Sequence, residues 1–161
     1  MAHMTRPKYM NQRTLNAISL KPLDDQLEVS EIVDRIKARR LELKATQVIV
    51  AECACVLAQT FNNLEAGAHK FAKVDVILRI MESLGLALFA DGKEMPDQDT
   101  LVSAIKAKLK TLPGPIGRYL GHDAGNQITL WTRGDTKPSM SVVLRYLGRL
   151  GIRATMERKN A

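Results

Sequence analysis

The chain has 161 residues, of which 45% are hydrophobic and 4% aromatic, and its formal net charge is +7. This length suits one domain or two small ones. No apolar run approaches the ~18 residues that a membrane helix needs, and the N-terminus lacks the apolar region of a secretory signal. The sequence therefore excludes a membrane-spanning protein and predicts a cytoplasmic one. Cys53 and Cys55 are too few and too close for a disulfide framework.

The positive charge is concentrated at the two ends of the chain. Residues 1–40 have a net charge of +3, residues 41–100 of −4 and residues 101–161 of +8, the last from eleven basic and three acidic residues. A basic segment of this density suggests a polyanionic partner, with nucleic acid as the first candidate. A solubilising surface explains the charge alone equally well.

Residues 1–29 are expected to form a flexible basic arm, of which residues 1–4 resemble a cloning remnant. From Ser30, a good N-cap residue, apolar residues recur at helical spacing as far as Leu43. Thr46 is expected to cap a second helix.

A short third helix, Ala58–Glu65, and an amphipathic fourth helix, Val74–Leu84, follow, each ended by a glycine. Leu86–Ala90 is a candidate strand. These elements define a first predicted domain over residues 30–90.

A second domain is predicted over residues 99–161, after an acidic linker at 91–98 that contains Gly92 and Pro96. Thr100 is expected to cap its first helix, and short helices are expected near 116–120, 124–133 and 139–150. Residues 152–157 alternate apolar and polar side chains, as a half-buried strand does.

An internal repeat relates the two predicted domains. The segment 78–86 (LRIMESLGL) recurs 66 residues later as 144–152 (LRYLGRLGI), and 65–67 matches 132–134 at an offset of 67. The two matched segments are one residue further apart in the first copy than in the second, which accounts for the difference. The repeat predicts an all-α fold of two tandem units, each with four to five short helices and room for a terminal strand.

The stretch 46–67 resembles the lambda-repressor-like (XRE-type) helix-turn-helix family. Its in-register matches are Thr46, Gln47, Ala51, Val56, Phe61, Leu64, Glu65 and Gly67. The resemblance covers residues 31–90 well and 99–157 more weakly. It implies that Arg40 pairs with Glu65 in a structural ion pair, and that Cys55 stands where the family has a turn glycine. A left-handed backbone at Cys55 would cost on the order of 1 kcal/mol.

Two helices joined by a short turn can place the second in the DNA major groove. Gln47 begins the first of these helices, where a phosphate can bind. The outward positions of the second helix are predicted to contact bases, because glutamine and asparagine pair with adenine and methyl groups contact thymine. These positions are Ala58, Gln59, Thr60, Asn62 and Asn63. The alternative is that these polar side chains only keep an exposed helix face hydrated and bind nothing.

The second unit departs further from the pattern, since Pro113-Gly114-Pro115 replaces the opening Thr-Gln pair. Its predicted DNA contacts are Arg118, Asn126, Gln127, Thr129, Arg133 and Lys137. Trp131 is interpreted as a core residue rather than a stacking platform. Because this unit is the more positively charged and phosphates are negative, we expect it to contribute at least as much DNA affinity as the first.

The sequence therefore predicts a DNA-binding transcriptional regulator, with a repressor as the expected type, from a bacterial, phage or plasmid source. Double-stranded DNA is the expected partner. A homodimer is expected too, because the strand at 86–90 or 152–157 can pair across a two-fold axis. The alternative is an antitoxin-type interaction module whose partner is a toxin or another regulator. No phosphate loop, nucleophile elbow or metal-ligand pattern is present, so neither enzyme activity nor a cofactor is expected.

Overall fold

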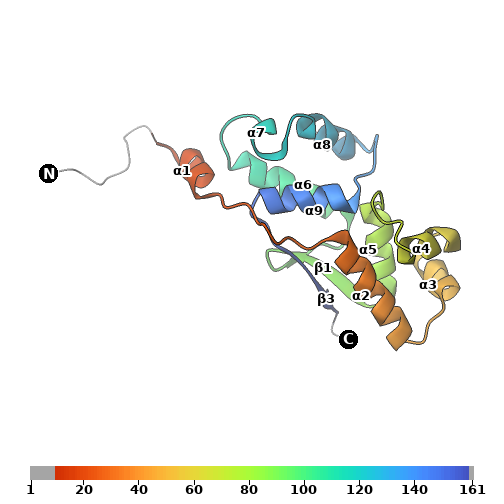
Figure 1. The fold of residues 1–161 in the computed structure, drawn as a ribbon. Helices are drawn as coiled ribbons and strands as arrows, with labels where there is room; N and C mark the ends of the chain where they lie inside the picture. The colour runs from red at the N-terminus through yellow and green to blue at the C-terminus, as the bar shows by residue number, and fades with distance from the viewer. Residues whose placement is uncertain (1–9, 160–161) are drawn as a thin grey trace.

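The computed structural model describes residues 10–159 and is predominantly helical, with one small antiparallel sheet (Figure 1). Its first half contains α1 (Gln12–Ser19), α2 (Val29–Glu42), α3 (Gln47–Ala54), α4 (Ala58–Glu65), α5 (Val74–Ser83), β1 (Leu86–Ala90) and β2 (Lys93–Glu94). Its second half contains α6 (Gln98–Lys110), α7 (Gly117–Leu120), α8 (Ala124–Arg133), α9 (Met140–Arg149) and β3 (Ala154–Arg158). Among the residues described, no helix has the length and apolar character needed to cross a membrane.

The segment expected to be a flexible arm is attached to the second half of the chain from residue 10 onward. Helix α1 is capped by Asn11 and donates hydrogen bonds from Arg13 and Asn16 to the carbonyls of Leu112 and Thr111. The chain then runs along α9 to the start of α2 (Figure 1). On the way Gln26 bonds the backbone of residues 152 and 154. Arg6 and Lys8, also assigned to the arm, lie outside the described residues.

The two expected strands are present, but they pair with each other within one chain. The sheet has the order β2-β1-β3, and β1 pairs antiparallel with β3 from Leu86 opposite Arg158 to Ala90 opposite Ala154. The expectation that the strand at 86–90 could pair across a dimer interface is therefore wrong, because both edges of β1 are already occupied, by β2 and β3. The backbone N–H and carbonyl groups at the edge of a sheet need hydrogen-bond partners. At the start of β3 the side-chain carbonyl of Gln26 accepts from the backbone N–H of Ala154.

Residues expected to form a linker at 91–98 are part of the folded unit. A tight turn at Asp91-Gly92 connects β1 to β2. Met95 is buried, and its backbone N–H donates to the carbonyl of Leu88 at 2.8 Å. Asp97 then caps α6 by accepting from the backbone N–H of Thr100. The two halves are therefore joined by ordered backbone rather than by a spacer.

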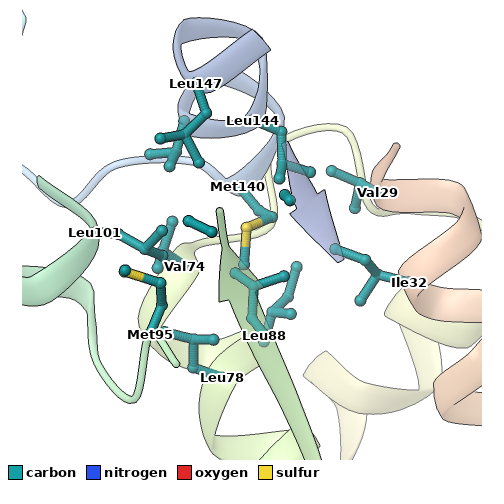
Figure 2. Close-up of a cluster of buried hydrophobic side chains, with 14 of the residues drawn as sticks. Val29, Ile32, Val74, Leu78, Leu88, Met95, Leu101, Met140, Leu144 and Leu147 are labelled. Atoms are coloured by element: carbon teal, nitrogen blue, oxygen red, sulfur yellow. The ribbon is translucent and has the colours of Figure 1, made fainter. Parts of the chain in front are cut away.

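Buried side chains from both halves form one hydrophobic core. In Figure 2, Leu88 of β1 lies among Val74 and Leu78 of α5 and Met140 of α9, with Leu101 of α6 close by. Such a shared core excludes water from both halves at once, and burying each large aliphatic side chain contributes about 1.5–3 kcal/mol. The two halves therefore stabilise each other.

Candidate nucleic-acid interface

Helices α3 and α4 are joined by a short turn with a left-handed residue. Thr46 caps α3 by accepting from the backbone N–H of Ile49 at 3.2 Å. Cys55 ends it with φ 56° and ψ 43°, and the N–H of Val56 reaches back to the carbonyl of Ala51 at 3.0 Å. Helix α4 begins at Ala58. This is a helix, a three-residue turn and a second helix, the local geometry of a helix-turn-helix.

The outward face of α4 is polar and carries no charge. Phe61 and Leu64 are buried, as the periodicity predicts. Ala58 is half-buried, whereas the four other candidate contacts are exposed, namely Gln59, Thr60, Asn62 and Asn63. The side-chain amide of Gln59 donates to the side-chain carbonyl of Asn63 at 2.8 Å. These amides form a row that can donate and accept hydrogen bonds at base edges.

A buried ion pair fixes α4 to α2. Arg40 donates two hydrogen bonds to the Glu65 carboxylate, Nε to Oε2 at 2.8 Å and an Nη to Oε1 at 2.7 Å, so the expected ion pair is present. The two side chains are only 11% and 2% exposed. Burial alone would raise the pKa of Glu65, but the hydrogen bonds from Arg40 and Gln47 hold it below its ordinary value. Arg40 also donates to the carbonyl of Ala45 at 3.0 Å.

Gln47 belongs to this cluster rather than to the surface. Its side-chain amide donates to Oε1 of Glu65 at 2.8 Å, and the residue is half-buried. The amide predicted to bind phosphate is thus already engaged, while the residue still begins α3. Together Arg40, Gln47 and Glu65 tie three helices into a rigid support for the outward face of α4.

The first turn of α3 exposes apolar side chains, as do the residues that flank this helix. Val48 and Ile49 are about half exposed, and Leu57 in the turn is 76% exposed. Leu41 and Leu43, at the end of α2, are also exposed. We call these five residues the α3 apolar surface. Its exposed neighbours Glu52, Cys53 and Cys55 add no positive charge, so this surface is poorly suited to a phosphate backbone.

The predicted contacts of the second half are dispersed. On α8, Asn126, Thr129 and Arg133 are exposed, and Thr129 donates its hydroxyl hydrogen to the carbonyl of Gly125 at 2.9 Å. Gln127 turns inward and accepts from the hydroxyl of Tyr146 at 2.5 Å. Such a bond leaves Gln127 less free to contact a base.

Two further residues predicted to contact DNA, Lys137 and Arg118, lie against other residues of the chain. Lys137 forms an ion pair with Asp75 of α5 at 2.9 Å. Burial alone would raise the pKa of Asp75, but the hydrogen bond from Lys137 lowers it. Arg118 stands on α7 with its guanidinium against Gly114. Trp131 is buried and packs on the ring of Tyr146, with ring centres 5.7 Å apart, as expected of a core residue.

The loops that follow α4 and α8 are hydrogen-bonded to each other, a contact that was not among the predictions from sequence. The N–H of Val74 donates to the carbonyl of Pro138 at 3.0 Å, and the N–H of Met140 donates to the carbonyl of Ala72 at 2.8 Å. In the repeat, position 72 corresponds to 138 and position 74 to 140, each at an offset of 66 residues. The two hydrogen bonds therefore join equivalent positions, with the donor in the first loop in one bond and in the second loop in the other. The internal repeat was the available signal, because matching segments can meet reciprocally.

Over the described residues, no cluster of three or more His, Cys, Asp or Glu side chains is arranged to hold a metal ion. A comparison of the chain with protein-family models, with curated proteins and with solved structures found no match.

Proposed function

We propose that this protein is a sequence-specific DNA-binding transcriptional regulator of the lambda-repressor-like helix-turn-helix type. The observation that carries the proposal is the outward row of Gln59, Thr60, Asn62 and Asn63 on α4, presented by a short left-handed turn. Uncharged amides at successive outward positions suit adenine edges in a major groove. The Arg40–Glu65–Gln47 cluster supports the row, since specific contacts need a rigid platform.

We also propose that the chain contains two helix-turn-helix units, α2–α5 with β1 and α6–α9 with β3. Both have the same order of elements. The reciprocal bonds of Val74 with Pro138 and of Met140 with Ala72 are what a local two-fold axis between equivalent loops produces. The pairing of β1 with β3 supports the same axis. One chain then presents both α4 and α8, so a single copy can occupy an imperfect palindrome that otherwise requires a homodimer.

Binding at an operator that overlaps a promoter would exclude the polymerase, which makes repression the simplest regulatory outcome. The first test is selection of duplexes from a random library, followed by fluorescence anisotropy at several salt concentrations. Replacing Gln59 and Asn63 together with alanine should weaken binding to the selected site by about 10- to 100-fold, because a good bidentate pair contributes about 1–3 kcal/mol of discrimination.

The chain supplies a matched control for this variant. Gln12 and Asn16 of α1 form the same hydrogen-bonded pair at the same spacing, with 3.0 Å between the amide nitrogen and the carbonyl oxygen. Replacing both with alanine should leave affinity within about twofold of the original. Failure to select any duplex, or equal affinity of both double variants, would refute the proposal.

A second candidate function, a protein-interaction module such as an antitoxin, is favoured by the α3 apolar surface. Large apolar side chains exposed in one region of a fold are typical of protein interaction sites. Co-expression with the product of the adjacent gene, followed by size-exclusion chromatography, tests this candidate. Ile49→Gln with Leu57→Gln should abolish a complex formed through this surface, whereas the Gln59/Asn63 variant should not.

A further inference from the structure

A cleft of about 460 Å³ lies between α6 and α8 on the second half of the chain. Its inner wall is apolar and is formed by Leu109, Ile116 and Ile128. Gly125 helps to leave the cleft open, because a Cβ there would meet nothing nearer than Ile116 at 4.0 Å, whereas the space beside Gly114 is taken by the guanidinium of Arg118. Its other lining residues are polar or charged, namely Arg13, Lys106, Lys110, Thr129, Thr132 and Arg133.

The rim of the cleft is strongly positive. Arg13, Lys106, Lys110 and Arg133 line it, and the guanidinium of Arg118 lies against Gly114 at its edge. No Asp or Glu lines it, and none of the five cations takes part in an ion pair within residues 10–159. Like charges around one cleft repel each other, so an anion bound between them is favoured.

The two threonines contribute less to anion binding than the cations do. Thr129 and Thr132 already donate their hydroxyl hydrogens to carbonyls of α8, at 2.9 and 2.8 Å. Arg13 is held at the rim by a hydrogen bond from its guanidinium to the carbonyl of Leu112. The recognition chemistry is therefore positive charge around an apolar wall.

A comparison with the first half explains why this space is open. There Arg40 and Glu65 bridge α2 and α4. Arg40 lies four residues after the core residue Ile36 of α2, and Leu109 lies four residues after the core residue Ile105 of α6. Thr132 follows Glu65 by the 67-residue offset of the repeat. The second half thus lacks the ion pair at the equivalent place.

We propose that this cleft binds a small organic anion, a phosphate or carboxylate carried on an aryl or alkyl body. The rim cations would hold the anionic group, and the apolar wall would bury the body. Charge complementarity selects an anion, and the wall distinguishes such a ligand from inorganic phosphate. If the proposed function holds, bound ligand and DNA compete for Thr129 and Arg133, and the ligand acts as an effector that releases the operator.

The probe is phenyl phosphate, and its binding to the full chain is measured by titration in ¹H–¹⁵N correlation spectra. It should shift the amide signals of Gly114, Gly125 and Thr129, and it should bind at least about tenfold more tightly than inorganic phosphate or phenol. Equal binding of inorganic phosphate, or shifts spread over the whole basic surface, would overturn the proposal.

Gly125→Leu tests the site directly. A Cβ at Gly125 meets only Ile116, at 4.0 Å, so a larger side chain can enter the cleft without a clash at its base. This variant should lose phenyl phosphate binding, and Gly125→Ala, the milder change, should weaken it. Unchanged binding in both variants would overturn the proposal.

Charge variants complete the experiment. Lys106→Gln with Lys110→Gln should weaken phenyl phosphate binding about tenfold, whereas Lys21→Gln with Lys93→Gln, which removes the same charge elsewhere, should change it less than about twofold. A further arm measures DNA affinity with and without phenyl phosphate. Ligand binding that leaves DNA affinity unchanged would refute the effector role alone, and absence of any DNA binding would refute only the proposed function.

Discussion

Replacing Cys55 with glycine should stabilise the protein, although it removes a side chain. Cys55 has φ 56° and ψ 43° at the end of α3. A residue with a Cβ pays about 1–2 kcal/mol in this left-handed conformation. Glycine has no such strain but loses more backbone entropy on folding, by about 0.5–1 kcal/mol.

The difference between these two costs spans about 0–1.5 kcal/mol, so we expect Cys55→Gly to gain about 0.5–1 kcal/mol, the middle of that range, in the free energy of unfolding. Little packing is lost, because Cys55 is exposed. For a chain of this size the gain raises the melting temperature by roughly 1–4 °C, within reach of calorimetry under reducing conditions. Urea unfolding should show a higher midpoint with an unchanged slope.

Cys53 supplies the matched control, since it is the same residue type, is also exposed, and stands two positions earlier within α3. Cys53→Gly should lower stability by about 0.5 kcal/mol, because glycine is a poor helix former. Cys55→Ala keeps a Cβ and should give no gain. Equal destabilisation by Cys53→Gly and Cys55→Gly would refute the assignment of strain to this turn.

Two further predictions concern buried and partly buried carboxylates. Glu65→Gln should cost about 3–5 kcal/mol in urea unfolding, because it leaves Arg40 without a counter-charge, and a loss below about 1 kcal/mol would contradict the buried ion pair. The pKa values of Glu65 and Asp75 are both lowered in the folded state. Their contribution to stability should therefore be fully present above the unfolded-state pKa values, about 4, and should be lost as the pH falls further. Unfolding free energies of the wild type and of Asp75→Asn at pH 7 and pH 3 should differ less at pH 3, and an equal difference at both would contradict this sign.

Local features of the fold could be predicted from sequence because they depend on neighbouring residues. A short apolar run directly after the glycine that ends the preceding helix predicts a strand at Leu86–Ala90, where the structure has β1. Two predicted helix caps were wrong. Ser30 and Thr100 were expected to cap α2 and α6, but the N-cap residues in the structure are Glu28 and Asp97. At α6 the Asp97 carboxylate accepts from the N–H of Thr100, and at α2 the N–H of Glu28 donates to the Glu31 carboxylate in a capping box, so each helix extends back to the earlier residue.

Long-range features could not be predicted in the same way. The docking of α1, the pairing of β1 with β3 and the cation-rimmed cleft each join residues far apart in the chain. The row on α4 follows from helical periodicity alone and was found. The inward turn of Gln127 depends on Tyr146 of the next helix, so no pattern within α8 indicates it.

The charge asymmetry of the sequence has a partly internal explanation. Of the eleven basic residues in 101–161, four form ion pairs with acidic residues of the first hundred, among the residues described, namely Lys137 with Asp75, Arg153 with Asp25, Arg158 with Glu42 and Lys159 with Glu94. The pairs of Arg153, Arg158 and Lys159 are exposed and each contributes little, about 0–1 kcal/mol, whereas Asp75 in the fourth pair is partly buried. They nevertheless show that part of the +8 of the second half is complementary to acidic groups of the first.

Seven of the eleven basic residues in 101–161 form no ion pair among the residues described. Four of these seven, Lys106, Lys110, Arg118 and Arg133, lie around the cleft between α6 and α8 and not on the outward row of α4. The exposed amide row and this cluster of positive charge thus lie on different halves of the chain. If one chain binds DNA with both units, α4 should supply sequence discrimination and the surface around α8 should supply most of the salt dependence. Mutations in the two places should then separate specificity from affinity.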